Sequence, residues 1–293
     1  MKYLHILKEL YGRPVLMTHE TFETCHKLIQ SKLDITRPKF FGLVKPKVKL
    51  QIEDDMEDDE DMEEYPEFEI IGDVAYIDVI GVIGKRLGFI EKSCGACDIN
   101  DIQENTRQAM NNPMINTVVY NFDSGGGGVS GIPETAEMIA GCGRKKKTLA
   151  FIDGMCGSAA YWLASSCNEI YATPSSQVGS IGVYCYILDE SKAYEKEGIE
   201  PKLVKAGKNK GEFLPGLPIE QESLDNLQTE VDAIYKNFTG FVSQYRSISN
   251  DYMQGRTYYG EDAQAKGFVD ILVNSINDIF ISTTLMETVN PTQ

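Results

Sequence analysis

Ser158 is the candidate nucleophile in this sequence. It stands where a strand-like segment, 147–153, meets a helix-compatible run, 158–167. At the start of a helix the backbone N–H groups are free, and the positive end of the helix dipole favours developing negative charge. Small neighbours at positions 157, 159 and 160 let another backbone approach closely. A serine that opens a helix is also a common N-cap, so the interpretation depends on the rest of the chain.

A glycine-rich loop, Ser124–Gly128, offers consecutive backbone N–H groups with almost no side chains. Glycine permits the dihedral angles that aim such groups at an anion. A phosphate loop would end in Gly-Lys-Ser or Gly-Lys-Thr, whereas this loop ends in Gly-Val-Ser, and the dinucleotide fingerprint is not met in full. The remaining functional interpretation is an oxyanion hole for acyl transfer, which requires a nucleophile such as Ser158 nearby.

A serine nucleophile needs a base, and the three histidines all lie within the first 26 residues. A lysine is the economical alternative. Lysine acts as a base only when its pKa falls from about 10.4 to roughly 7–8. The segment 205–211 follows a strand-like run and holds Lys205, Lys208 and Lys210. Spacing alone does not choose among the three, and a solvated basic loop is the alternative interpretation.

The seven cysteines give weaker signals. Their odd number lacks the spacing of a disulfide framework, so reduced thiols are expected. Cys94 and Cys97 form one Cys-x-x-Cys pair, but a closed zinc site needs four ligands. Cys156 lies beside the candidate serine but has no histidine base in the body of the chain. We therefore expect neither a metal nor a cofactor.

Composition narrows the class of protein. The chain has 293 residues, 42% of them apolar and 25% charged, which is typical of a globular protein. A net charge of −16 argues against nucleic acid as a partner. No run approaches the roughly 18 apolar residues that would span a bilayer, and the first residues lack a signal-peptide pattern. We expect no membrane anchor and a cytoplasmic location.

Strand-like and helix-like segments alternate from about residue 68 onward. This alternation predicts a mostly parallel sheet with right-handed crossovers, and Asp98 or Asn100 is available to cap one of the helices. The expected strands are 74–80, 116–122, 147–153, 169–172, 179–184 and 201–206, and the expected helices are 21–33, 99–110, 132–141, 158–167, 188–197 and 220–247.

Several blocks, in order, resemble peptidase family S49, which includes signal peptide peptidase A and phage prohead proteases. The resemblance runs from about residue 68 to residue 272. It departs from the family at Gly125, where most members have proline, and at Cys156 and Gly157, where phage members often have alanines. The matching blocks are Asp123–Val129 (Asp-Ser-Gly-Gly-Gly-Gly-Val), Gly154–Ala164, Val178–Val183, Ala206–Lys210 (Ala-Gly-Lys-Asn-Lys), Gly255–Ala263 and Lys266–Asp270.

The resemblance implies a role for each site residue. Ser158 attacks the scissile carbonyl carbon. Lys210, the last lysine of its block, takes the serine proton and later delivers it to the leaving amine. The N–H groups of Gly127 and Ala159 stabilise the oxyanion, and Ser180 orients the lysine.

The resemblance also implies a fold and an organisation. The fold class is α/β, a crotonase-like and Clp-protease-like ββα superhelix with a small N-terminal extension. We expect residues 1–50 to form an assembly or docking extension, 51–67 an acidic linker containing the acidic block 53–64, 68–278 the peptidase domain and 279–293 a tail. Family members form rings or similar homo-oligomers, and the substrate peptide is expected to lie as an added strand beside the glycine loop.

The expected function is a Ser–Lys endopeptidase that processes phage capsid or scaffold proteins during head maturation. The N-terminal 50 or so residues look more like phage members than like the bacterial signal-peptide enzymes. Three alternatives remain: a host cytosolic enzyme of the signal-peptide-peptidase type, a non-catalytic assembly protein that keeps the fold, and an acyl-CoA enzyme of the crotonase type.

Overall fold

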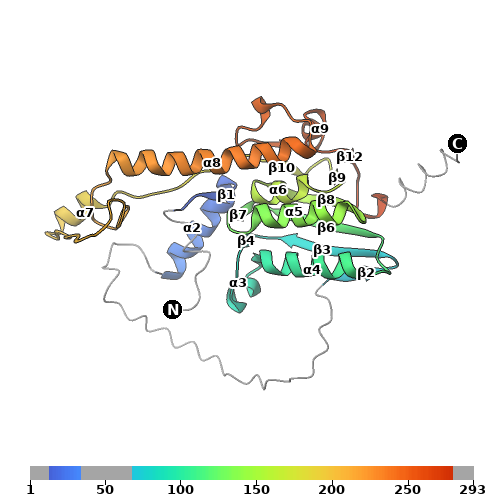
Figure 1. Ribbon diagram of the computed structural model, residues 1–293, viewed down its shortest axis with the longest axis horizontal. Coiled ribbons are helices and arrows are strands. Elements are labelled where there is room, and N and C mark those ends of the chain that lie inside the picture. The colour runs from blue at the N-terminus through green and yellow to red at the C-terminus, as the bar shows by residue number, and fades with distance from the viewer. Residues whose placement is uncertain (1–12, 34–67, 280–293) are drawn as a thin grey trace, which may run out of the picture.

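A computed structural model describes residues 13–33 and 68–279 of the chain (Figure 1). The expected acidic linker, 51–67, and its acidic block lie outside the described residues. So does the expected tail, apart from its first residue. The expected division into an extension, a linker and a peptidase domain remains a proposal.

The larger sheet of the described residues has eight strands and is mostly parallel. Six of its strands lie in the order β11-β10-β8-β6-β3-β2. Strand β9 pairs with the first half of β8, and β12 pairs with β9. Only the outer pairs β2–β3 and β10–β11 are antiparallel. The strands of this sheet are β2 (Glu69–Ile71), β3 (Val74–Ile80), β6 (Thr117–Ser124), β8 (Lys147–Gly157), β9 (Glu169–Ala172), β10 (Gln177–Gly179), β11 (Thr257–Tyr259) and β12 (Ile271–Leu272).

A second sheet of four short strands has the order β1-β7-β4-β5. Its strands are β1 (Val15–Met17), β7 (Gly126–Gly128), β4 (Ile83–Gly84) and β5 (Cys97–Asp98). Strand β7 is the glycine loop of the sequence. It pairs with β4 in parallel and with the N-terminal strand β1 in antiparallel register. The glycine loop is therefore a strand in the middle of a sheet.

Helices from the repeated strand–helix units pack on one face of the larger sheet (Figure 1). Between this face and the helices lies the main apolar core. The opposite face carries a smaller cluster formed by Val119, Phe151 and Tyr171 among others. The helices are α2 (His19–Leu33), α3 (Phe89–Ser93), α4 (Ile99–Asn111), α5 (Ile132–Gly143), α6 (Ala159–Ser165), α7 (Ser191–Lys196), α8 (Gln221–Tyr245), the 3-10 turn Asn250–Tyr252 and α9 (Gly260–Ala265).

A side-chain cap fixes the start of α4, and an aromatic stack fixes the packing of α6. Asp98 caps α4 by accepting the N–H of Asn100 at 2.9 Å, which confirms the first of the two expected caps. Trp162 on α6 stacks on Phe238 of α8 with a ring separation of 4.5 Å. Since both side chains are fully buried, this stack fixes α6 behind the sheet.

The segment 185–230, here called the arm, projects from the body (Figure 1). It contains α7, the turns that follow and the first half of α8. The prediction of a strand over 201–206 is wrong: these residues pair with no strand among the described residues. The expected strand 179–184 is also shorter, because β10 ends at Gly179 and Tyr184 makes only an isolated bridge to Val15.

Candidate active site

Ser158 lies between the end of β8 and the first residue of α6, as the sequence predicted. Its backbone has φ 55° and ψ −116°, which an L-residue rarely adopts. The N–H of Ser158 donates to the carbonyl oxygen of Gly179 at 2.9 Å, and its own carbonyl accepts from Trp162 at 2.9 Å. These bonds and the buried α6 hold the strained residue in place.

The side chain of Ser158 does not act as a helix cap. No hydrogen bond runs from its hydroxyl to the first turn of α6. The hydroxyl instead faces the carbonyl oxygen of Gly182 at 3.5 Å, and the residue is 1% exposed. The simple N-cap interpretation is therefore wrong, and the strained backbone requires another explanation.

The glycine loop comes close to the first turn of α6. A Cβ atom placed on Gly126 would lie 3.0 Å from the backbone nitrogen of Ala159. One placed on Gly127 would lie 1.8 Å from the carbonyl oxygen of Ile83, so no side chain fits there. This contact explains the run of glycines: β7 must fit between its neighbours and the helix start. The structure brings Gly127 and Ala159 to the same part of the molecule as Ser158.

Two polar side chains brace the loop. The hydroxyl of Ser124 donates to the carbonyl oxygen of Gly81 at 2.6 Å and accepts the N–H of Gly126 at 3.1 Å. The carboxylate of Asp123 accepts the N–H of Met155 at 3.0 Å, which ties β6 to β8 just before Ser158. A braced loop keeps its N–H groups oriented before any substrate arrives.

Ser180 also lies at this site. Its backbone is left-handed, with φ 53°, and its N–H donates to the carbonyl oxygen of Arg256 at 2.7 Å. The residue is buried, and its Cβ lies 3.6 Å from the position that a Cβ on Gly157 would take. Ser180 is therefore held beside Ser158, where a base could reach both.

Lys210 does not lie at this site. It occupies an exposed turn of the arm, and its N–H donates to the carbonyl oxygen of Gly207 at 3.2 Å. Lys205 donates to the carbonyl oxygen of Lys208 at 2.7 Å, and Lys208 pairs with Glu222. Of the three candidate lysines, Lys210 is the one whose ammonium group has no partner among the described residues. Within one chain, Ser158 thus lies near Gly127, Ala159 and Ser180, and Lys210 lies away from them.

The comparisons with known proteins agree with this geometry. Residues 142–283, which include Ser158, Ser180 and Lys210, match the model of peptidase family S49. This match covers 142 of the 293 residues, so the likeness to peptidase family S49 is shown for the second half of the chain. Nothing in that match assigns roles to individual residues.

Curated relatives of this chain include phage proteins. Capsid assembly protease C of Escherichia phage lambda is 28% identical over 227 residues, which are 76% of this chain and 52% of the relative. Head-tail preconnector protein GP5 of Enterobacteria phage P21 is 27% identical over 224 residues, 75% of this chain and 44% of the relative. The chain thus spans about half the length of the curated relatives it matches.

Solved structures with a partly similar backbone have low sequence identity to this chain. An enoyl-CoA hydratase from Thermoplasma volcanium is 16% identical with a TM-score of 0.42, and 77% of each chain is covered. A ClpP1 mutant from Listeria monocytogenes is 12% identical with a TM-score of 0.39, covering 69% of this chain and 92% of the other. The predicted α/β fold class is confirmed by the parallel strand–helix units and the S49 match.

Two other candidate groups, a thiol and an imidazole, are unsuitable as nucleophile or base. Burial raises the pKa of the Cys156 thiol well above its usual value, so this neighbour of the serine stays protonated. His19 pairs with Glu23 at 3.6 Å, and its side chain is 82% exposed. Neither group competes for the role of nucleophile or base.

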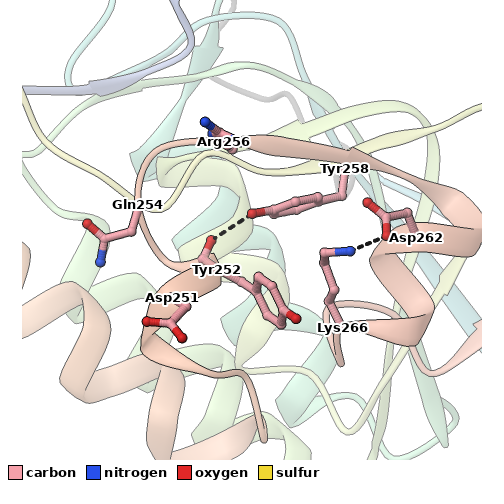
Figure 2. A pocket seen from close by; sticks show the side chains of 7 residues that line it. All are labelled: Asp251, Tyr252, Gln254, Arg256, Tyr258, Asp262 and Lys266. Atoms are coloured by element: carbon pink, nitrogen blue, oxygen red, sulfur yellow. Dashed lines mark hydrogen bonds and ion pairs between the residues drawn. The ribbon is translucent and has the colours of Figure 1, made fainter.

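Lys266 lies in an open pocket of about 540 Å³ that Tyr252, Tyr258 and Asp262 also line (Figure 2). Its ammonium group lies 5.1 Å from the ring centres of both Tyr252 and Tyr258 and pairs with Asp262. The hydrogen bond that Lys266 donates to the carboxylate of Asp262 raises the pKa of Lys266, and a base needs the opposite shift. Arg256, whose carbonyl oxygen accepts the N–H of Ser180, lines the same pocket.

Sequence reasoning missed the N-terminal strand at this site. β1 pairs with the glycine strand, and Thr18 and Thr21 fill the space beside Gly125. A Cβ on Gly125 would lie 1.9 Å from the hydroxyl oxygen of Thr21. Gly125, which stands where most family members have proline, therefore contacts the N-terminal helix α2. The signal in the sequence is a short apolar run, Val15–Met17, after a proline.

No helix of the described residues has the length and apolar character to cross a bilayer. Within the same ranges, no group of three or more histidine, cysteine, aspartate or glutamate side chains is placed to hold a metal ion. Cys94 is exposed and Cys97 is half-buried, and both are free thiols.

Proposed function

We propose that this chain is a serine endopeptidase in which Ser158 is the nucleophile and Lys210 of a second copy is the base. The observation that carries the proposal is the arrangement around Ser158: a buried, strained serine lies between a braced glycine strand and the start of α6. The match of residues 142–283 to peptidase family S49 supports the same reaction.

The exposed position of Lys210 supports a base supplied by another chain. The arm carries six of the large apolar side chains that the described residues expose. These are Tyr186, Leu188, Leu203, Val204, Leu214 and Leu224. Apolar surface of this kind marks an interface, and in a closed ring each arm would reach its neighbour in the same way. Burial of the arm against the neighbour would also desolvate the lysine, as a lysine base requires.

The reaction follows from these groups. The oxygen of Ser158 attacks the carbonyl carbon of the peptide bond while its proton passes to the neutral amine of Lys210. The N–H groups of Gly127 and Ala159 donate to the tetrahedral oxyanion. The C–N bond then breaks, and the leaving amine takes the proton from Lys210. Water hydrolyses the resulting ester with Lys210 again as base, and the hydroxyl of Ser180 keeps the lysine in position.

The proposed substrates are capsid or scaffold proteins of a phage, processed during head maturation in the host cytoplasm or prohead. Two of the curated relatives carry names of phage capsid assembly and head–tail proteins. A peptide segment would bind as an extended strand beside β7, since a strand edge supplies backbone hydrogen bonds to any sequence.

Alanine variants test the two reacting residues. Ser158→Ala and Lys210→Ala should each lower the cleavage of fluorescently labelled casein by about 10³-fold or more. Ser175→Ala, at an exposed serine, and Lys208→Ala are the matched controls and should change the rate less than about twofold. Activity in Ser158→Ala would contradict the assignment of the nucleophile. A wild-type chain that oligomerises but never cleaves or labels with a fluorophosphonate would indicate a non-catalytic assembly protein.

A further inference from the structure

Strand β1 fills a slot between strand β7 and the segment that contains Tyr184. On one side, its register places Val15, Leu16 and Met17 opposite Gly128, Gly127 and Gly126 of β7. On the other side, Val15 and Tyr184 exchange hydrogen bonds, with N–H to oxygen distances of 2.8 and 3.3 Å.

The slot runs directly past the serine. After β1 the chain continues with Thr18, whose N–H donates to the carbonyl oxygen of Gly125 at 2.7 Å. The methyl carbon of Thr18 lies 2.6 Å from the place that a Cβ on Gly157 would take, next to Ser158. Thr18 is 3% exposed and Ser158 is 1% exposed. The N-terminal segment therefore occupies the space through which a peptide would approach the nucleophile.

The side chains of β1 alternate as those of a bound peptide do. Val15 and Met17 lie in a small apolar cluster with Phe22. Leu16 points the other way, into the main core. Thr18 contacts the glycines, where only a short side chain fits. A peptide with an apolar residue in the place of Leu16 and a small residue in the place of Thr18 would match this slot.

Helix α2 fastens the strand in the slot. The ring of Phe22 packs edge-on against Tyr184 and Tyr186, with centroid distances of 5.8 and 5.4 Å. The hydroxyl groups of Thr18 and Thr21 lie 2.9 Å apart beside Gly125. The cluster of Val15, Met17 and Phe22 is separate from the main core, so withdrawal of β1 and α2 would uncover this cluster and Leu16 and leave the rest of the main core packed.

We propose that Val15–Thr18 is a pseudosubstrate strand, which occupies the peptide-binding slot of its own chain. A peptide reaches Ser158 only when β1 withdraws, and the apparent affinity for peptide is the intrinsic affinity reduced by the small open fraction. The proposal rests on the proposed function for the identity of the reacting serine. Peptide binding can nevertheless be tested without catalysis.

A reversible disulfide tests whether β1 must leave. Val15 and Tyr184 form a hydrogen-bonded antiparallel pair, whose Cα atoms are about 5.5 Å apart in such ladders, within the disulfide range of about 4.4–6.8 Å. The chain would carry Val15→Cys and Tyr184→Cys together with Cys25→Ser and Cys185→Ser, which remove the neighbouring thiols. Ser158→Ala is added for the binding measurement.

The probe is a fluorescein-labelled peptide with the sequence of residues 13–20. Fluorescence anisotropy measures its binding to the protein. The reduced protein should bind the probe, and oxidation should weaken binding by about tenfold or more, with recovery on reduction. Equal binding by the oxidised and reduced proteins, or by neither, would overturn the proposal. The same disulfide in the Ser158 chain should switch off cleavage. If oxidation blocks binding but the reduced chain with Ser158 never cleaves casein, the proposed function fails and the pseudosubstrate strand stands.

A second variant loosens the fastening without changing a residue of β1 or of the glycine strand β7. Phe22→Ala should strengthen probe binding by several-fold because it raises the open fraction. Thr24→Ala, on the exposed side of the same helix, is the control and should leave binding unchanged. Hydrogen exchange of the amides of residues 15–18 should be faster in Phe22→Ala than in Thr24→Ala. Exchange and binding that are alike in the two variants would contradict the fastening role of α2.

Discussion

The surroundings of Ser158 and the surroundings of Lys210 differ in almost every physical respect. Ser158 lies at the end of the longest strand, against a helix whose residues are all buried, and beside glycines that exclude side chains. Lys210 lies on an exposed turn of the arm, near Val204, which is 97% exposed. One region is complete within a single chain, and the other offers both a free charge and uncovered apolar surface.

This difference indicates how the proposed site is divided. A nucleophile with its oxyanion donors needs a rigid frame, which a packed sheet and helix supply. A base that arrives with a neighbouring chain needs only a defined interface. We infer that cleavage depends on assembly, and that β1 adds a second condition at the level of the single chain. The predictions below test the contrast between body and arm.

The largest effect is expected when two inactive variants are mixed. Ser158→Ala supplies an intact Lys210, and Lys210→Ala supplies an intact Ser158. If each site uses residues of two chains, an equimolar mixture after subunit exchange should recover about a quarter of the wild-type casein cleavage, from about a thousandth or less for each variant alone. Two variants that stay inactive after exchange, with assembly verified by light scattering, would place both residues in one chain.

The two halves of α8 should differ strongly in their contribution to folding. Phe238, fully buried, stacks on Trp162, whereas Leu224 lies 37% exposed on the arm. Phe238→Ala should lower the free energy of unfolding by about 3–5 kcal/mol, and Leu224→Ala by about 1 kcal/mol or less. Urea denaturation followed by circular dichroism measures both. Similar losses would show that the arm is as firmly packed as the body.

The apolar surface of the arm should matter for assembly and not for folding. Val204→Asp places a charge in the proposed interface, so it should dissociate the oligomer and reduce cleavage by about tenfold or more. Met114→Asp is the matched control, because Met114 is 75% exposed and lies outside the arm. Sedimentation velocity and casein cleavage report the two effects. Equal behaviour of the variants would remove the arm from the interface.

The smallest effects concern the thiols. Burial raises the pKa of Cys97 to about 12 from a usual value of 9.0, and it also raises the pKa of Cys156. The folded chain at pH 8 should therefore react with iodoacetamide at the exposed Cys94 and not at Cys97 or Cys156. Mass spectrometry of the peptides identifies the labelled sites. Fast labelling of Cys156 would show that the body near Ser158 opens.

The same pKa shift has a consequence for stability. Because the folded chain holds the Cys97 proton more tightly than the unfolded chain, the contribution is fully present below about pH 9 and is lost as the pH rises toward 12. The free energy of unfolding should decrease over this range, and Cys97→Ser should reduce the slope. An unchanged slope in Cys97→Ser would assign the alkaline loss to other groups.

Most of the body was predictable from the sequence because its signals are local. The bounds of β3 agree with the expected strand 74–80, and α4 begins at the expected cap, Asp98. The predicted strand–helix junction at Ser158 agrees with the end of β8 and the start of α6. The segment 201–206 was mistaken for a strand because β propensity describes a residue's fit to a neighbouring strand, and no strand among the described residues pairs with this segment.

The amino-acid sequence by itself determined the parallel strand–helix units, the position of Ser158 and the choice of three lysines, since periodicity, glycine spacing and charge are properties of neighbouring residues. Tertiary structure decided what lies against what. It placed Val15–Thr18 in the slot beside the glycine strand and left Lys210 on the arm, because contacts between residues more than a hundred positions apart depend on the packed fold. No local pattern encodes such a contact.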